Sequence, residues 1–201
     1  SQVFIGISDT NLMNRLIGGG ADPASEWFRK TKSTLTAISL FEKIGFEGQV
    51  QHESEWLASY FNLSSNDFRQ IVDDQKQRGV IQGKYFISVT PFLLRVHLLQ
   101  EWWRVRGLSK ETFEKFVSGM PEKARPDLLT RFFEQVPYIS NTERGKEFIK
   151  DILGEKGIYA DGTLLKSEGG ARFFLNLCEA DTEAGLRCLK RTLGRWSKEE
   201  L

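Results

Sequence analysis

The sequence contains few of the side chains that build catalytic and metal-binding sites. Two histidines and two cysteines occur among its 201 residues. The thiols of Cys178 and Cys188 are too few for a disulfide framework or a zinc site, and we interpret both as small buried side chains in a reducing compartment. His97 lies in an apolar stretch, where a packed histidine is expected, and His52 lies beside surface glutamates. The sequence therefore predicts no catalytic, cofactor-binding or metal-binding residue and no enzyme activity of its own.

Signatures of nucleotide binding and of membrane insertion are also missing. A phosphate-binding loop needs Gly, four further residues, Gly, Lys and then Ser or Thr, and this pattern does not occur. We therefore interpret the triple glycine at residues 18–20 as a hinge. No apolar run approaches the roughly 20 residues that span a bilayer, and no signal peptide is present. We expect a cytoplasmic protein with no membrane partner and no ATP or Mg²⁺ on this chain.

The chain lacks an excess of charge of either sign. Its 28 Lys and Arg residues nearly balance its 27 Asp and Glu residues. A dedicated nucleic-acid-binding protein usually has a basic excess, because phosphate contacts supply most of its non-specific affinity. With 40% hydrophobic and 12% aromatic residues, the composition is that of a folded protein with a sizeable core.

Hydrophobic periodicity predicts three helices in the first half of the chain. The third is the best defined, because Ser64 or Ser65 can cap it and Phe68, Ile71 and Val72 recur at the spacing of one inward face. The three helices are expected at residues 24–44, 53–61 and 65–79.

A tight β-hairpin is predicted directly after the third helix. Residues 80–82 and 85–89 are β-prone, and the two-residue loop between them, with glycine first, suits a type II′ turn. Three helices followed by a hairpin are the order of a winged helix-turn-helix, which we assign to residues 24–90. Residues 1–23 precede it as an N-terminal segment and linker.

A helical domain is predicted from residue 91 to residue 201. Its first helix, residues 91–106, is apolar nearly all round, so we expect it to be buried on several faces and shared by both domains. Ser140 and Glu143 have the spacing of a capping box at the start of a later helix. Other helices are expected to begin at Ser109 and Pro126, and to occupy residues 168–178 and 182–193, with Asp181 as a cap. The predicted fold class is thus mostly α with a small β-hairpin.

The two ends of the chain have the patterns of interrupted elements. Residues 3–8, VFIGIS, have the composition of a strand, and Ser197 followed by Glu200 has the spacing of a helix start. We expect the sequence to be part of a longer protein.

Residues 65–79 occupy the place of the DNA-reading helix in a winged helix, but their charge pattern is unfavourable for DNA. From Lys32 to Thr90 there are six basic and seven acidic residues. Asp73 and Asp74 are expected on the outward face, where they would repel phosphates.

The same outward face supplies the candidate contact residues for a protein or DNA partner. Arg69, Gln70 and Gln77 have side chains that suit base edges. The full candidate set is Arg69, Gln70, Asp73, Asp74, Lys76 and Gln77 on the helix and Lys84 on the hairpin loop.

Two stretches carry a family resemblance. DPASEWFRKTKSTLTAISLFEKIGFEGQV, residues 22–50, and VTPFLLRVHLLQEWW, residues 89–103, resemble the region that follows the nucleotide-binding core in STAND-type signalling ATPases of archaea and bacteria. In that family an AAA+-related ATPase module is followed by a winged helix and then by helical domains.

The resemblance implies a non-catalytic regulatory role in a larger ATPase. The winged helix would contact the protein's own upstream nucleotide-binding domain and other protein segments, and ATP and Mg²⁺ would be bound only by that upstream domain. Two alternatives stay open: a DNA-binding winged-helix transcriptional regulator and a purely structural spacer.

Overall fold

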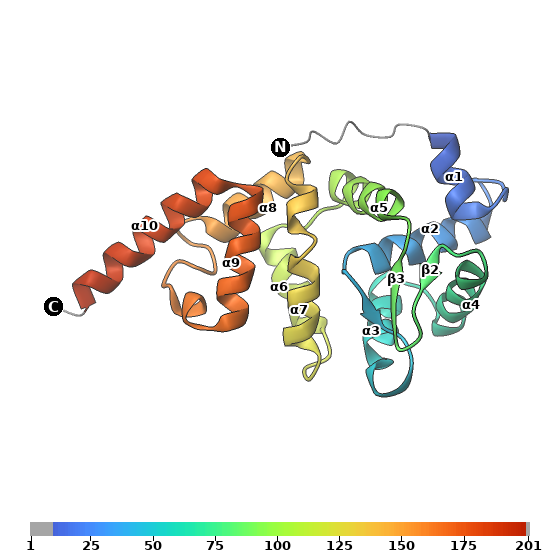
Figure 1. Ribbon diagram of the computed structural model, residues 1–201, viewed down its shortest axis with the longest axis horizontal. Helices are drawn as coiled ribbons and strands as arrows, with labels where there is room; N and C mark the ends of the chain where they lie inside the picture. Colours follow the sequence, from blue (N-terminus) through green and yellow to red (C-terminus); the bar gives the residue numbers. More distant parts are fainter. Residues whose placement is uncertain (1–9, 200–201) are drawn as a thin grey trace. The chain divides into compact units, whose positions relative to one another are not determined.

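The computed structural model describes residues 10–199 and shows a mostly helical protein with a small antiparallel sheet (Figure 1). This confirms the predicted predominance of helix. The strand-like run at residues 3–8 lies outside the described residues. The chain forms two compact units, one ending at Leu99 and the other beginning at Gln100, and the boundary falls within helix α5 (Phe92–Val105).

The first unit combines four helices with three short strands. Ser25 begins the second of these helices by accepting a hydrogen bond from the amide of Phe28 (3.1 Å), and Ser64 begins the fourth by accepting one from the amide of Asp67 (3.0 Å). Of the two predicted candidates for this cap, Ser64 and Ser65, the structure confirms Ser64. The elements are α1 (Thr10–Gly18), α2 (Glu26–Ser39), β1 (Ile44–Gly45), the 3₁₀ turn η1 (Gly48–Val50), α3 (His52–Tyr60), α4 (Ser65–Gln77), β2 (Ile81–Gln82) and β3 (Phe86–Val89).

The sheet has a third strand that periodicity did not predict. The helix expected to reach residue 44 ends at Ser39, and β1 pairs with β3, where Ile44 lies opposite Ile87. β2 pairs with the other edge of β3, so the strand order is β1-β3-β2. Ile44 is fully buried, and its pairing with Ile87 assigns its side chain to the sheet and not to the apolar stripe of α2.

The predicted two-residue hairpin turn is wrong. Gln82 lies opposite Ser88, so residues 83–87 separate the paired positions. The carbonyl of Tyr85 accepts a hydrogen bond from the amide of Phe46 (2.7 Å), directly after β1. Because this bond holds the start of β3 against β1, the chain cannot close onto β2 over two residues.

A buried carboxylate connects α3 to the sheet. Glu53, which the sequence predicts at the surface, is 2% exposed, and its side chain accepts a hydrogen bond from the amide of Gly45 (2.7 Å). A side chain at Gly45 would place its Cβ 2.5 Å from the carbonyl oxygen of Val50. Glycine is therefore required for the close approach that brings this amide to the carboxylate.

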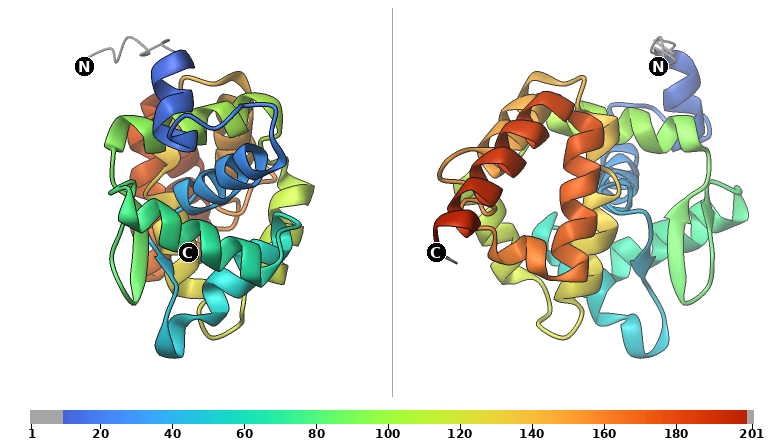
Figure 2. Two further views of the ribbon diagram at one scale, coloured as in Figure 1. Left: turned by 90° about the vertical axis from the view of Figure 1, so that its right-hand side faces the viewer. Right: turned by 60° about the vertical axis from the view of Figure 1, so that its left-hand side comes forward.

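The second unit consists of helices around an aromatic core. Trp103 and Phe148 have ring centroids 5.1 Å apart, and Phe113 lies 5.2 Å from Phe148. Figure 2 shows the last two helices side by side, joined at Asp181. Asp181 is the predicted cap, and its carboxylate accepts a hydrogen bond from the amide of Ala184 (2.9 Å). The elements after α5 are α6 (Lys110–Gly119), α7 (Arg125–Phe133), η2 (Val136–Ile139), α8 (Glu143–Leu153), η3 (Thr163–Lys166), α9 (Glu168–Ala180) and α10 (Thr182–Glu199).

Two predicted helix starts in this unit are wrong. Ser140 does not cap α8, because its hydroxyl donates back to the carbonyl of Pro137 in η2 (2.9 Å). The cap is Thr142, whose hydroxyl accepts a hydrogen bond from the amide of Gly145 (3.1 Å). Ser197 does not begin a helix, because α10 continues without a break from Thr182 to Glu199.

Helix α5 is less completely buried than its composition predicts. Leu94 and Leu98 are buried, but Phe92, Leu93 and Val105 are exposed. Some apolar side chains of α5 therefore lie outside its packed face and are exposed to solvent. No helix in the part of the chain that the structure describes is both long enough and apolar enough to cross a membrane.

Replacing Glu53 tests the connection between α3 and β1. Glu53→Ala leaves the amide of Gly45 without its acceptor, and we expect a loss of about 1–3 kcal/mol in the free energy of unfolding, measured by urea denaturation. Glu55→Ala is the matched control on the same helix, because Glu55 is exposed and hydrogen-bonds only at the surface. The control should change stability by less than about 0.5 kcal/mol. Equal losses for the two variants would contradict a special role for Glu53.

Candidate interaction surface

Polar and charged side chains on the exposed face of α4 line a shallow, open groove of about 450 Å³. The opposite face of α4 packs into the core through Phe68, Ile71 and Val72, which are at most 2% exposed, as predicted. Five of the predicted contact residues come together in the groove, joined by one residue that was not predicted, Asn66. The predicted members are Arg69, Gln70, Asp73, Asp74 and Gln77.

Lys76 does not line this groove. Its ammonium group lies 4.5 Å from the ring centroid of the buried Phe46 and 4.0 Å from a carboxylate oxygen of Glu47. The guanidinium of Arg69 lies 5.2 Å from the same ring. Cations over an aromatic face are attracted to its negative centre, so both side chains are held close to the protein surface.

Lys84, the candidate on the loop before β3, is exposed and separate from the groove on α4. Its ammonium group lies 5.5 Å from the ring centroid of its neighbour Tyr85, which is itself 58% exposed. The structure therefore places the seven candidate residues in three environments.

Arg78, at the C-terminal end of α4, caps the C-terminus of α1. Its guanidinium donates hydrogen bonds to the carbonyls of Arg15 (3.0 Å), Leu16 (2.9 Å) and Ile17 (2.7 Å). The last carbonyls of a helix have no partner within the helix, so the guanidinium satisfies those of Leu16 and Ile17 and adds a second donor to that of Arg15, which also accepts from the amide of Gly19 (2.8 Å). The triple glycine interpreted as a hinge ends α1, and Gly19 has the positive φ (62°) of a C-terminal cap.

A chain of hydrogen bonds continues from Arg78 to the groove. Gln75 is 1% exposed, accepts a hydrogen bond from Arg78 (3.1 Å) and donates one to the carboxylate of Asp74 (2.9 Å). Asp74 lines the groove. The polar surface of α4 is thus connected to α1 through the buried amide of Gln75 and the exposed guanidinium of Arg78. Sequence reasoning missed Arg78, because its partners lie more than 60 positions earlier and leave no local signal.

Lys30 connects α2 to the first turn of α4. Its ammonium group lies 2.9 Å from Glu26 and 3.0 Å from Asp67. The hydrogen bond from Lys30, together with one involving Ser64, holds the pKa of Asp67 below its ordinary value.

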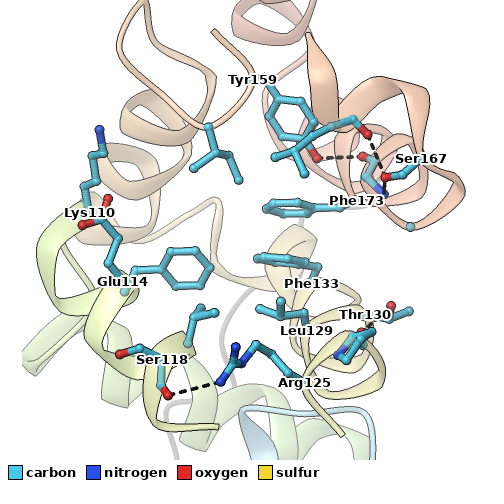
Figure 3. Close-up of a pocket in the computed structure, with 17 residues that line it drawn as sticks. Lys110, Glu114, Ser118, Arg125, Leu129, Thr130, Phe133, Tyr159, Ser167 and Phe173 are labelled. Atoms are coloured by element: carbon cyan, nitrogen blue, oxygen red, sulfur yellow. Dashed lines mark hydrogen bonds between the residues drawn. The ribbon is translucent and has the colours of Figure 1, made fainter. Parts of the chain in front are cut away.

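A second candidate site is a cavity of about 600 Å³ in the second unit, which sequence reasoning also missed. In Figure 3 the rings of Phe133 and Phe173 lie parallel on one side, opposite side chains of α6 that include Glu114 and Ser118. The walls come from α6, α7, the start of α9 and the loop that carries Tyr159. Its apolar lining residues have the spacing of ordinary core residues, so their pattern did not distinguish a cavity from a filled core.

The polar groups around this cavity are mostly engaged with the backbone. The hydroxyl of Tyr159 donates to the carbonyl of Gly170 (2.7 Å), and burial raises the pKa of Tyr159, so the hydroxyl stays protonated. Arg125 donates to the carbonyls of Met120 (3.2 Å) and Ser118 (3.4 Å).

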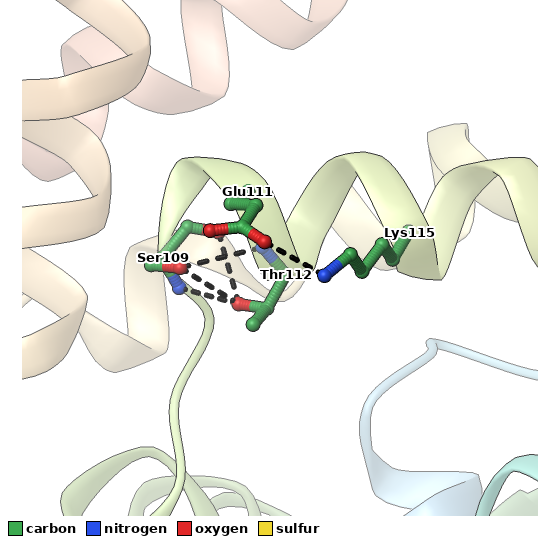
Figure 4. Close-up of polar contacts among 4 residues, drawn as sticks. All are labelled: Ser109, Glu111, Thr112 and Lys115. Carbon is green, nitrogen blue, oxygen red and sulfur yellow. Dashed lines mark hydrogen bonds and ion pairs between the residues drawn. The ribbon is translucent and has the colours of Figure 1, made fainter.

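Helix α6, one wall of the cavity, begins with the cap predicted at Ser109. The hydroxyl of Ser109 accepts a hydrogen bond from the amide of Thr112 (3.3 Å), and the hydroxyl of Thr112 accepts one from the amide of Ser109 (2.8 Å) (Figure 4). Glu111 and Lys115 form an exposed ion pair one turn apart (2.7 Å). These reciprocal contacts fix the start of the helix that positions Glu114 and Ser118.

Comparison of the chain with protein-family models, curated proteins and solved structures finds no match. Among the described residues, no three His, Cys, Asp or Glu side chains are grouped so as to hold a metal ion. The α4 groove and the cavity in the second unit are the two candidate sites.

Removing the guanidinium of Arg78 tests its role at the end of α1. In Arg78→Ala we expect amides in the last turn of α1 to exchange with deuterium about tenfold faster, because bonds from a charged donor contribute roughly 1.5 kcal/mol or more. Lys76→Ala is the control, because this substitution removes one positive charge from the same helix and Lys76 does not contact α1. Unchanged exchange in Arg78→Ala, or equal acceleration in both variants, would contradict the capping role.

Lys30→Met tests the electrostatic contact between α2 and α4. Without the Lys30 ammonium the pKa of Asp67 should rise toward its ordinary value, as measured by NMR titration of the side-chain carboxyl. A carboxyl whose pKa is lowered in the folded state stabilises the fold above its unfolded pKa. That stabilisation is lost as the pH falls through the folded pKa. The variant should therefore lose less stability than the wild type on acidification, and an unchanged pKa of Asp67 would contradict the contact.

Proposed function

We propose that residues 24–90 form a winged helix-turn-helix that binds protein, within a non-catalytic regulatory region of a larger STAND-like ATPase. The order helix, strand, helix, helix, strand, strand from α2 to β3 supports this proposal, as does the strand order β1-β3-β2. So does the resemblance of residues 22–50 and 89–103 to that family. In this role the region couples the nucleotide state of an upstream ATPase module to a conformational change.

The charge of the α4 groove favours a protein partner over DNA. Two carboxylates, Asp73 and Asp74, face one guanidinium, Arg69. The other cations near the end of α4 do not line the groove, because Lys76 lies over Phe46 and beside Glu47, and Arg78 donates to α1. A polyanion placed on this helix would meet a net negative surface and could release few counterions, which is the main source of non-specific affinity for DNA.

The hydrogen bonds from Asp74 through Gln75 to Arg78 supply a route for the proposed coupling. A partner that binds Asp74 competes with Gln75 for the carboxylate, and Gln75 also accepts from the guanidinium that caps α1. Binding at the groove and displacement of α1 are therefore expected to influence each other, and such coupling is reciprocal.

DNA binding is the second candidate, favoured by the exposure of Arg69, Gln70 and Gln77 in the same groove. These side chains can hydrogen-bond to base edges. The winged-helix element order would also place α4 at the major groove in such a complex.

An electrophoretic shift assay with duplex DNA separates the two candidates. We expect the purified chain to give no shift even at low salt. The double variant Asp73→Lys/Asp74→Lys should give a shift that weakens as salt is added, because its groove then carries three cations, and it serves as the positive control. A salt-dependent shift by the wild-type chain would contradict protein-only binding.

The regulatory role is tested in the protein that carries the proposed ATPase module. Asp73→Asn/Asp74→Asn should change the rate of ATP hydrolysis about fivefold. This is the change that a coupling free energy at the lower end of the typical range, about 1 kcal/mol, would produce. Glu111→Gln, a change to an exposed carboxylate on α6, should leave the rate unchanged. If the double variant hydrolyses ATP at the wild-type rate, the region is a spacer and not a coupling module.

A further inference from the structure

The cavity in the second unit is lined by aromatic rings that pack against one another. The rings of Phe133 and Phe173 stack within 9° of parallel, and Phe113 lies 5.8 Å from Phe133 between centroids. Tyr159 packs 5.7 Å from Phe173 and is fixed by its hydrogen bond to the backbone of Gly170. The space of about 600 Å³ beside these rings is partly open to solvent, so a small molecule can enter it.

The size and composition of this cavity fit a small molecule. Pockets that bind small ligands typically enclose roughly 300–1,000 Å³ and combine an apolar lining with a few polar groups that fix orientation. Here aromatic and aliphatic side chains form the body of the cavity, including Val117 and Leu129, which are half-buried and face open space. Gly169 adds room at the start of α9, since a Cβ built there meets no atom within 4 Å.

The charged groups on the lining favour an anion. Lys110 and Arg125 supply two cations against one carboxylate, Glu114. The guanidinium of Arg125 is half-buried and only partly satisfied: its two hydrogen bonds to carbonyls measure 3.2 and 3.4 Å, and its Nε atom is buried without a partner among the described residues. A planar guanidinium in an apolar setting is well suited to a carboxylate, which can accept two hydrogen bonds from it.

We infer that this cavity binds a small, mostly apolar molecule that carries a single carboxylate. Its apolar body lies against Phe113, Phe133 and Phe173, and its carboxylate accepts hydrogen bonds from Arg125. Lys110 adds longer-range attraction. The two ends of the ligand are thus recognised separately, by apolar burial and by charge. Binding of such a ligand in the second unit does not depend on the role proposed for α4.

Isothermal titration of the full chain with decanoate and with decanol tests both parts of this inference. The two probes share an apolar tail and differ in charge. We expect decanoate to bind with a stoichiometry of one and about tenfold more tightly than decanol. Arg125→Gln should weaken decanoate binding about tenfold, the effect of losing a hydrogen bond from a charged donor, and should leave decanol binding unchanged. Lys115→Gln is the matched control, because it removes a positive charge from the exposed side of α6 and should change neither affinity.

Two variants that fill the cavity locate the site. Val117→Trp and Gly169→Phe place an aromatic ring in the open space from α6 and from α9 respectively, and each should abolish binding of both probes. Thermal unfolding of each variant shows whether it is folded, and Gly169→Phe adds a side chain where no neighbouring atom obstructs it. Binding that survives in a folded filling variant places the ligand elsewhere and overturns the inference. Equal affinity for decanoate and decanol overturns the assignment of an anionic ligand, and the absence of binding by either probe overturns the site.

Discussion

The hydrogen bonds from Arg78 to the last carbonyls of α1 determine how α4 presents its charge. A guanidinium at this position on a free helix would extend a cationic surface toward a partner. Here it is turned back onto Arg15, Leu16 and Ile17 and is also bound by the buried Gln75. The same contact gives α1 a C-terminal cap, so one side chain both orders the start of the described chain and lowers the positive charge available on α4.

The consequence for function is electrostatic. With Arg78 on α1 and Lys76 over Phe46, the groove of α4 retains Arg69 against two aspartates. A surface of this kind has little attraction for phosphates, whereas side chains of both signs with amides between them suit the polar rim of a protein interface. The proposed regulatory role follows from this distribution of charge more than from the proposed winged-helix arrangement, because that arrangement also serves DNA-binding proteins.

Sequence reasoning succeeded where the signal is local. The caps at Ser64, Ser109 and Asp181 were predicted because a capping side chain and its amide partner lie within three residues. It failed where partners are distant in sequence. Strand β1 was assigned to a helix because its pairing with β3 leaves no trace in the local periodicity, and Ile44 continues the spacing of α2 by coincidence. The cavity was not predicted for a related reason. Aromatic residues that fill a core and aromatic residues that line a cavity have the same spacing in the sequence.

The central claim is that Arg78 is withdrawn from the surface of α4 that we propose binds a partner. Hydrogen exchange of its guanidinium protons, followed by NMR in the wild-type chain, tests this claim most directly, with Arg69 as the internal reference because it lines the open groove. The Arg78 protons should exchange markedly more slowly than those of Arg69, since they donate to backbone carbonyls at 2.7–3.0 Å. Equally fast exchange for the two side chains would show that Arg78 is free to contact a polyanion and would contradict the account.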